Sequence, residues 1–246
     1  MHAVPNENPI VLVLPRFSPW MKRLSIASAV VWVVCVILRS VAPNVLGTLF
    51  EFAALRGATT LGRWRLWTVG TYAWLDNPGG FAIAWTVLSF WLIGSPVERL
   101  LGAKRTLELV GLGILGGALV ALAASRVSPS SFQDSVVGMG AASSALLAGM
   151  GFVYANQTVT FFGLAPMKGK HLVLALAALS VLLGLYSRSA IGAASIGGLA
   201  SGAGWMWLAA RRGGGKGSAR RGRKTSGAHL RVVPKRDAAS DPKQWN

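Results

Sequence analysis

Six apolar blocks run through the first 210 residues of this sequence and leave few folds open to it. Only 13% of the 246 residues are charged, about half of the roughly 25% that soluble domains carry. In lipid a chain must form helices or a closed barrel, and these blocks are too long for barrel strands. We therefore expect an all-α membrane protein, a bundle of six transmembrane helices over residues 24–38, 80–94, 107–124, 136–154, 172–186 and 190–210.

The first block, 24–38, is short beside the roughly 17–25 residues of a spanning helix. It becomes long enough if the side chain of Arg39 reaches from the helix to the membrane surface. Lys22 and Arg23 before an apolar run also resemble the start of a signal peptide. Because Pro43 makes a poor cleavage context, we expect an uncleaved span.

Residues 44–79 are too polar to cross the membrane as one helix and too apolar for a solvated linker. They contain several tryptophans and tyrosines, which gather at the membrane–water interface. We expect this segment to lie along the membrane surface.

Lysine and arginine are unevenly divided between the two sets of connecting segments. One set contains Arg16, Lys22, Arg23, Arg99, Lys104, Arg105, Lys168 and Lys170. On the opposite side, beyond the long first segment, only Arg126 and Arg188 remain. Cytoplasmic segments carry the excess of Lys and Arg, so both termini are expected in the cytoplasm. The membrane itself is left open, with the plasma or inner membrane expected for a bacterial protein.

A basic tail, 211–246, contains eleven of the 25 lysines and arginines. Its composition cannot bury enough apolar surface to fold, so we expect a disordered cytoplasmic tail. Contact with anionic lipid stays open, whereas nucleic acid is not expected, since no aromatic stacking residues accompany the charges. The predicted organisation is an N-terminal cytoplasmic segment (1–23), a membrane domain (24–210) and this tail.

Cysteine and histidine are too scarce for a disulfide framework or a Cys/His metal site. Cys35 stands alone, and His2, His171 and His229 are far apart in the sequence. We expect no metal and no cofactor.

Glu98, just past the end of the second block, would be costly in lipid unless it paired with a cation or capped backbone donors. Arg99, Lys104 and Arg105 follow it. We interpret Glu98 as part of an ion pair that fastens the loop, not as a catalytic carboxylate.

The sixth block is rich in glycine, and Gly198 and Gly202 have the small-x-x-x-small spacing that lets helix backbones approach closely. The stretch GAASSALLAG at 140–149 supplies small residues in the fourth block. We expect the fourth and sixth helices to pack closely, whether or not the protein is an enzyme.

Taken in order along the chain, these stretches resemble the rhomboid family of intramembrane serine proteases and their inactive relatives. The resemblance covers roughly residues 25–210. The family has a Trp-Arg pair in the interfacial segment, a Glu-Arg-x-x-Gly run after the second span and a pair of glycines on the sixth. The matching residues in this chain are Trp64, Arg65, Glu98, Arg99, Gly102, Gly198 and Gly202.

The resemblance implies a nucleophilic serine on the fourth span and a histidine on the sixth. Ser143 best matches the nucleophile, or Ser144 if the register slips by one, but Ser195 stands at the histidine position. A serine needs an adjacent base, and a second hydroxyl cannot be one. The family's His and Asn oxyanion donors align with Ala82 and Thr86, a weaker set, so no intact catalytic set is expected.

We therefore favour a catalytically inactive rhomboid pseudoprotease that lies in membrane lipid and binds transmembrane segments of client proteins. The alternative is an active rhomboid-type intramembrane serine endopeptidase, with Ser143 as nucleophile and a non-standard base. A transporter or channel has little support, because spans two to six contain no clear ionisable residue. We also expect Ser143 and Ser195 to lie within hydrogen-bond reach, directly or through water.

Overall fold

A computed structural model describes residues 16–57, 60, 64–78, 80–127, 135–155, 157–159, 167–187 and 189–217 of the chain. The chain divides into two compact units, 1–209 and 210–246. The account below concerns the first unit. Most of the predicted basic tail, residues 218–246, lies outside the described residues, as do residues 1–15 of the predicted N-terminal segment.

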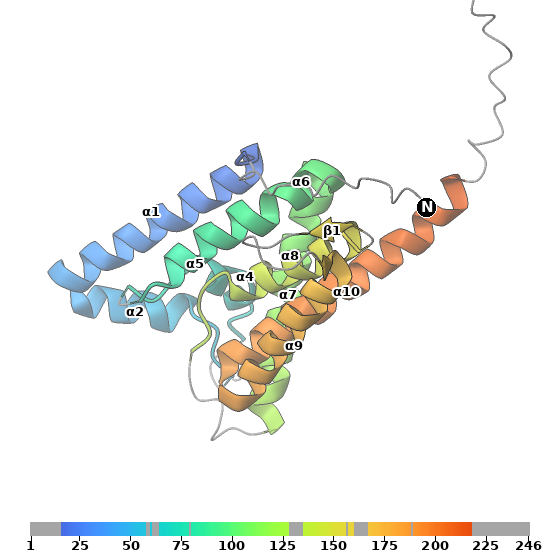
Figure 1. Cartoon of the computed structure of the whole chain (residues 1–246). Helices are drawn as coiled ribbons and strands as arrows, with labels where there is room; N and C mark the ends of the chain where they lie inside the picture. The colour runs from blue at the N-terminus through green and yellow to red at the C-terminus, as the bar shows by residue number, and fades with distance from the viewer. Residues whose placement is uncertain are drawn as a thin grey trace, which may run out of the picture. The chain divides into compact units, whose positions relative to one another are not determined.

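Each of the six predicted blocks coincides with a helix (Figure 1). The second is one continuous helical run, in which α5 passes through the π-helical turn η2 into α6. The bounds are α1 Pro19–Val41, α5 Ala82–Ser89, η2 Phe90–Gly94, α6 Ser95–Leu101, α7 Ala103–Val127, α8 Gly140–Val153, α9 Gly169–Ser187 and α10 Ala190–Gly217.

Among the described residues, three helices are long and apolar enough to cross a membrane by length and composition: Pro19–Val41, Ala103–Val127 and Gly169–Tyr186. Their outward faces are apolar, as lipid requires. On α9, for example, Leu174, Leu182 and Leu185 are 67%, 64% and 62% exposed.

Several helix ends differ from the sequence prediction. The first helix starts at Pro19, so Lys22 and Arg23 are inside it rather than in the segment before it. The fourth starts at Gly140 rather than near Val136, because Val136 pairs with Leu55 in an isolated antiparallel bridge. The second runs past Gly94 to the end of α6.

The segment between α1 and α5 contains α2 (Pro43–Ala53), α4 (Thr68–Thr71) and the 3-10 turn η1 (Tyr72–Trp74). The last carbonyls of a helix have no partner within it, and here later residues supply the donors. The guanidinium of Arg65, the indole of Trp67 and the hydroxyl of Thr71 donate to the carbonyls of Glu51, Phe52 and Ala53 at 2.9, 3.0 and 2.9 Å. The segment is therefore folded back on α2.

Tyr72 fixes the same segment to α7. Its side chain is fully buried, and its hydroxyl donates to the carbonyl of Ile114 at 2.8 Å. Burial raises the pKa of this phenol, so it remains a proton donor.

The predicted close contact between the fourth and sixth helices, α8 and α10, is confirmed. A Cβ atom at Gly198 would overlap the backbone carbonyl of Ala141, and one at Gly202 would lie 2.8 Å from the Cα of Ala145. A Cβ at Gly113 on α7 would lie 2.5 Å from the Cβ of Ala145. The three helices thus meet almost backbone to backbone.

Glu98 fastens the start of α1 to α6. Its buried carboxylate accepts hydrogen bonds from the backbone N–H groups of Trp20 at 3.3 Å and Met21 at 3.0 Å, and from the hydroxyl of Ser18. A helix N-terminus has free N–H groups and favours an anion. Of the two roles considered for Glu98, the structure shows the cap, and no ion pair of Glu98 occurs among the described residues.

Two further bonds hold the same junction. The guanidinium of Arg99 donates to the backbone carbonyl of Arg16, and the backbone N–H of Ser18 donates to the hydroxyl of Ser95 at 3.2 Å. The Glu-Arg pair therefore joins residues about 80 positions apart in the chain. It positions α1 against the helical run that leads to the candidate site.

Candidate functional site

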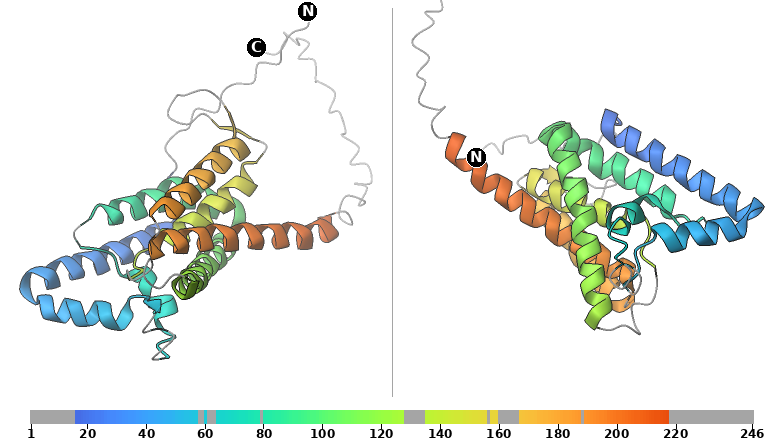
Figure 2. Two further views of the ribbon diagram at one scale, coloured as in Figure 1. Left: turned by 90° about the horizontal axis from the view of Figure 1, so that it is seen from below. Right: turned by 180° about the vertical axis from the view of Figure 1, so that it is seen from behind.

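A cavity of about 970 Å³ lies between α5, α8, α9 and α10, helices that Figure 2 shows from two further sides. Many of its lining residues carry hydroxyl groups on an otherwise apolar wall. Those hydroxyl residues are Thr86, Ser89, Ser135, Ser143, Ser144, Ser180, Tyr186, Ser189 and Ser195.

Ser143 is on the first turn of α8 and lines this cavity. Its side chain is only 8% exposed, and within the described residues its Oγ has no hydrogen-bond partner. A buried hydroxyl without a partner is costly. By contrast, Ser89 and Ser180 donate to carbonyls of their own helices at 2.7 and 2.8 Å. Ser143 thus differs from these two serines in having an unpaired hydroxyl, and Ser144 also borders the cavity.

Ser195 comes from α10 and lies against the start of α8. Its Oγ is 3.6 Å from the position that a Cβ would take at Gly140, one turn before Ser143. The two serines line the same cavity. Of the two contacts expected between them, the direct hydrogen bond is absent, since Ser143 Oγ has no partner among the described residues, and contact through water stays a prediction.

Ala82 and Thr86, both on α5, line the same cavity as these serines. Thr86 is buried, while Ala82 offers no side-chain donor. The structure thus brings the five residues aligned with the rhomboid nucleophile, base and oxyanion positions to one cavity.

His171 does not belong to this group. It lies in the first turn of α9, whereas the α9 residues that line the cavity begin at Ser180. Nine residues of helix at a rise of 1.5 Å place them about 14 Å apart along the axis. His171 is therefore too far along α9 to act on a group in the cavity.

Asp76 also lines the cavity, and the sequence did not single it out. It precedes α5, is 7% exposed, and its Oδ1 accepts a hydrogen bond from the backbone N–H of Asn77 at 2.8 Å. Burial raises the pKa of the Asp76 carboxyl above its ordinary value of 3.8, although the Asn77 bond opposes this. The turn residues that follow, in the stretch DNPGG, were the available signal for an acidic group at the start of a helix.

Gly138 explains how Asp76 comes to lie beside α8. Its φ of +94° is a backbone conformation that L side chains rarely adopt, and a Cβ there would lie 3.6 Å from Asp76 Oδ1. The Gly138 N–H donates to the carbonyl of Tyr72 at 3.0 Å. The chain turns sharply here and brings the N-terminus of α8 to the carboxylate.

In the part of the chain that the structure describes, no three His, Cys, Asp or Glu side chains lie close enough together to bind a metal ion. The chemistry open to the cavity is that of hydroxyls and one carboxylate.

A Rhomboid domain matches residues 63–212, more than half of the 246 residues. The chain belongs to the rhomboid family. None of the curated proteins compared with the chain matches it. With its apolar helices, the protein is a rhomboid-like integral membrane protein.

The backbone conformation of Gly102 explains the glycine that ends the Glu-Arg-x-x-Gly run. Gly102 ends α6 with a φ of +82°, and its N–H donates to the carbonyl of Glu98 at 2.9 Å. Glycine adopts this conformation without strain. Of the rhomboid Trp-Arg pair, Arg65 closes α2 as described, and Trp64 is 79% exposed, as befits a side chain at a membrane surface.

Proposed function

We propose that this rhomboid-family protein is a catalytically inactive pseudoprotease that binds transmembrane segments of client proteins in the cavity between α5, α8, α9 and α10. The observation that carries the proposal is the buried, unpartnered hydroxyl of Ser143 on the same cavity as Ser195, the residue that the sequence comparison sets at the position of the rhomboid histidine. A hydroxyl cannot take the proton of another serine at neutral pH.

The cavity supports the binding part of the proposal. Its wall is mostly apolar with scattered hydroxyl groups, which can donate or accept hydrogen bonds with a polar residue of a docked helix. A client helix embedded in the same membrane reaches the cavity through the surrounding lipid. Lipid, client transmembrane segments and, for the basic tail, anionic lipid are the proposed partners.

The competing function is an active intramembrane serine endopeptidase with Ser143 as nucleophile. The observation in its favour is Asp76, a carboxylate on the same cavity that could accept a proton. A carboxylate is the less common partner for a catalytic serine, and the oxyanion positions keep only Thr86 as a side-chain donor.

Labelling with a fluorophosphonate probe decides between the two. We expect the wild-type protein in detergent micelles to show no labelling above the Ser143→Ala variant. The positive control is the double variant Ser144→Gly, Ser195→His. It puts a glycine after the nucleophile and a histidine at the base position, as in the rhomboid pattern, and is expected to label at Ser143. Wild-type labelling that vanishes in Ser143→Ala would establish the endopeptidase instead.

A further inference from the structure

Asp76 is the one charged side chain among the described residues that line the cavity. It is more than nine-tenths buried, and its hydrogen bond from the Asn77 N–H, within the part of the chain that the structure describes, occupies Oδ1 alone. The backbone around it is held in place, since the indole of Trp32 on α1 donates to the carbonyl of Asn77 at 3.4 Å. A fixed carboxylate therefore borders a space lined otherwise by neutral groups.

The cavity is large enough to take a side chain of a docked helix beside this carboxylate. Its volume of about 970 Å³ far exceeds the roughly 30 Å³ that one water occupies in the liquid. Neither Lys, Arg nor His occurs among the described lining residues, so the protein's own described side chains leave the carboxylate without a cation there. Ser143, whose buried Oγ has no partner among the described residues, lines the same space.

Charge sets the kind of side chain that such a site favours. A carboxylate buried without a counter-ion is destabilised, and so is a Lys or Arg within a transmembrane segment. Each relieves the other when they meet, because neither then has to stay unpaired at low dielectric. A second anion would add repulsion, and an apolar side chain would leave the carboxylate as it is.

We infer that the client segments are transmembrane helices with a basic residue, and that Asp76 is its counter-ion in the cavity, with the Ser143 hydroxyl as an additional hydrogen-bond partner. The inference rests on the proposed function and specifies its client class. Asp76 lies before α5 and beside the start of α8, so the basic residue belongs in the third of the client helix nearest the membrane surface at which α5 begins.

The test uses single-span reporter helices of leucine and alanine that differ at one position in that third: Lys, Leu or Glu. Each is co-reconstituted with the full chain carrying a photo-crosslinking amino acid at Trp85, a cavity residue that is 65% exposed. We expect the Lys reporter to crosslink about tenfold more than the Leu reporter, which corresponds to about 1.4 kcal/mol, and the Glu reporter less than the Leu reporter.

Variants of Asp76 then assign the preference. Asp76→Asn should bring the Lys and Leu reporters to within about twofold of one another, and Asp76→Glu should keep most of the preference. Glu51→Gln, an exposed carboxylate that is absent from the described cavity lining, should change nothing. Because the three reporters are first compared on unaltered Asp76, an Asp76 variant that fails to fold does not remove the test.

Two failures are distinguishable. Equal crosslinking of the three reporters, or a Lys preference that survives in Asp76→Asn, would overturn the Asp76 inference and leave helix binding in place. Absence of crosslinking with every reporter would overturn the proposed function, and the inference with it.

Discussion

Two carboxylates are buried among the described residues of the membrane unit, and their surroundings are opposite. Glu98 accepts hydrogen bonds from two backbone N–H groups and a hydroxyl at the start of α1, whereas Asp76 accepts one, from Asn77. Donors stabilise a carboxylate, and burial without them favours the neutral acid. Glu98 thus stabilises the junction of α1 and α6. Asp76, which borders the cavity, lowers the stability of the folded protein.

Asp76→Asn should stabilise the protein at neutral pH. The pKa of Asp76 is raised in the folded state, mainly by burial, so the folded protein holds this proton more tightly than the unfolded chain. The wild-type therefore loses stability as the pH rises from the ordinary carboxyl value through the raised one, and the loss is complete above it. Asparagine keeps an oxygen for the Asn77 N–H and removes this dependence.

Thermal unfolding of the two proteins in detergent, at intervals from pH 4 to pH 8, measures the effect. The gap in Tm should be largest at the high end of the range and should shrink toward pH 4. The thiol of Cys35 interacts electrostatically with Asp76, so both proteins should carry Cys35→Ala. A gap that grew on acidification would contradict the assignment.

Glu98→Ala should destabilise the fold by about 1–3 kcal/mol, because it leaves buried N–H donors at the start of α1 without an acceptor. Glu108→Ala removes an exposed carboxylate from α7 and should stay within about 0.5 kcal/mol. Unfolding of both variants by a denaturing detergent provides the comparison. Equal loss in the two would mean that the cap contributes nothing specific.

At the level of helices, glycines decide which pairs approach most closely. Gly198 and Gly202 bring α10 onto α8, and a Cβ at Gly192 of α10 would lie 2.6 Å from the Cα of Gly184 on α9. Such contacts provide packing energy where lipid offers no hydrophobic driving force between helices. The cavity walls are thereby held at a fixed separation, which also places Ser195 beside Gly140.

Gly198→Ala should cost about 1–3 kcal/mol, the usual effect of overpacking, because its Cβ has no room against the Ala141 backbone. The matched control is Gly204→Ala on the same helix, where nothing lies within 4 Å of the added Cβ; it should be neutral or slightly stabilising. Thermal unfolding of the pair measures the difference. A Gly204→Ala variant as unstable as Gly198→Ala would rule out the packing explanation.

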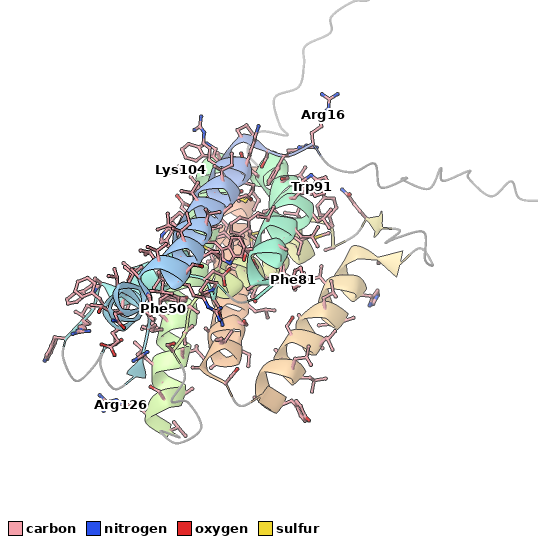
Figure 3. All side chains as sticks on the ribbon, turned by 90° about the vertical axis from the view of Figure 1, so that its left-hand side faces the viewer. Arg16, Phe50, Phe81, Trp91, Lys104 and Arg126 are labelled. Atoms are coloured by element: carbon pink, nitrogen blue, oxygen red, sulfur yellow. The ribbon has the colours of Figure 1, made fainter. Side chains whose placement is uncertain are left out.

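Over the membrane unit as a whole, basic side chains mark both ends of the helices, and Arg16, Arg99, Lys104 and Lys170 belong to one of them. Figure 3 places Arg16 and Lys104 at one end and Arg126 at the other. The backbone N–H of Lys170 donates to the carbonyl of Ala155, just after α8, at 3.4 Å. Arg99 is close enough to Tyr154, at the end of α8, to oppose the rise in its pKa that burial causes. Because cytoplasmic segments carry the excess of Lys and Arg, we expect the end with Arg16 and Lys104 on the cytoplasmic side.

Single cysteines test this orientation in cells whose protein carries Cys35→Ala. Arg126→Cys should react with a membrane-impermeant maleimide added outside intact cells, and Lys104→Cys should react only after permeabilisation. The reverse pattern would place the end with Arg16 and Lys104, and the N-terminus with it, outside the cytoplasm.

Local sequence was enough to locate the helices and the glycine contact, because transfer into lipid and small-residue spacing depend on neighbouring residues alone. Helix ends were harder. The start of α8 depends on the bridge between Val136 and Leu55, and the length of the second helix on η2, which continues α5 into α6. Neither has a signal in composition or periodicity. Ser143, Ser144, Ser195, Ala82 and Thr86 came from the rhomboid pattern, and their roles stay a proposal.

Apolar content and the order of the motifs were enough to predict a helical membrane protein of the rhomboid type. Both are visible in short stretches of sequence, and each apolar stretch partitions into lipid independently of the others. Tertiary structure decided the rest. Glu98 caps a helix 77 residues away, Asp76 borders the cavity of Ser143, and Ser195 lies by Gly140 rather than bonded to Ser143. These relations join residues distant in sequence, and only the packing of helices at glycine contacts sets the distances between them.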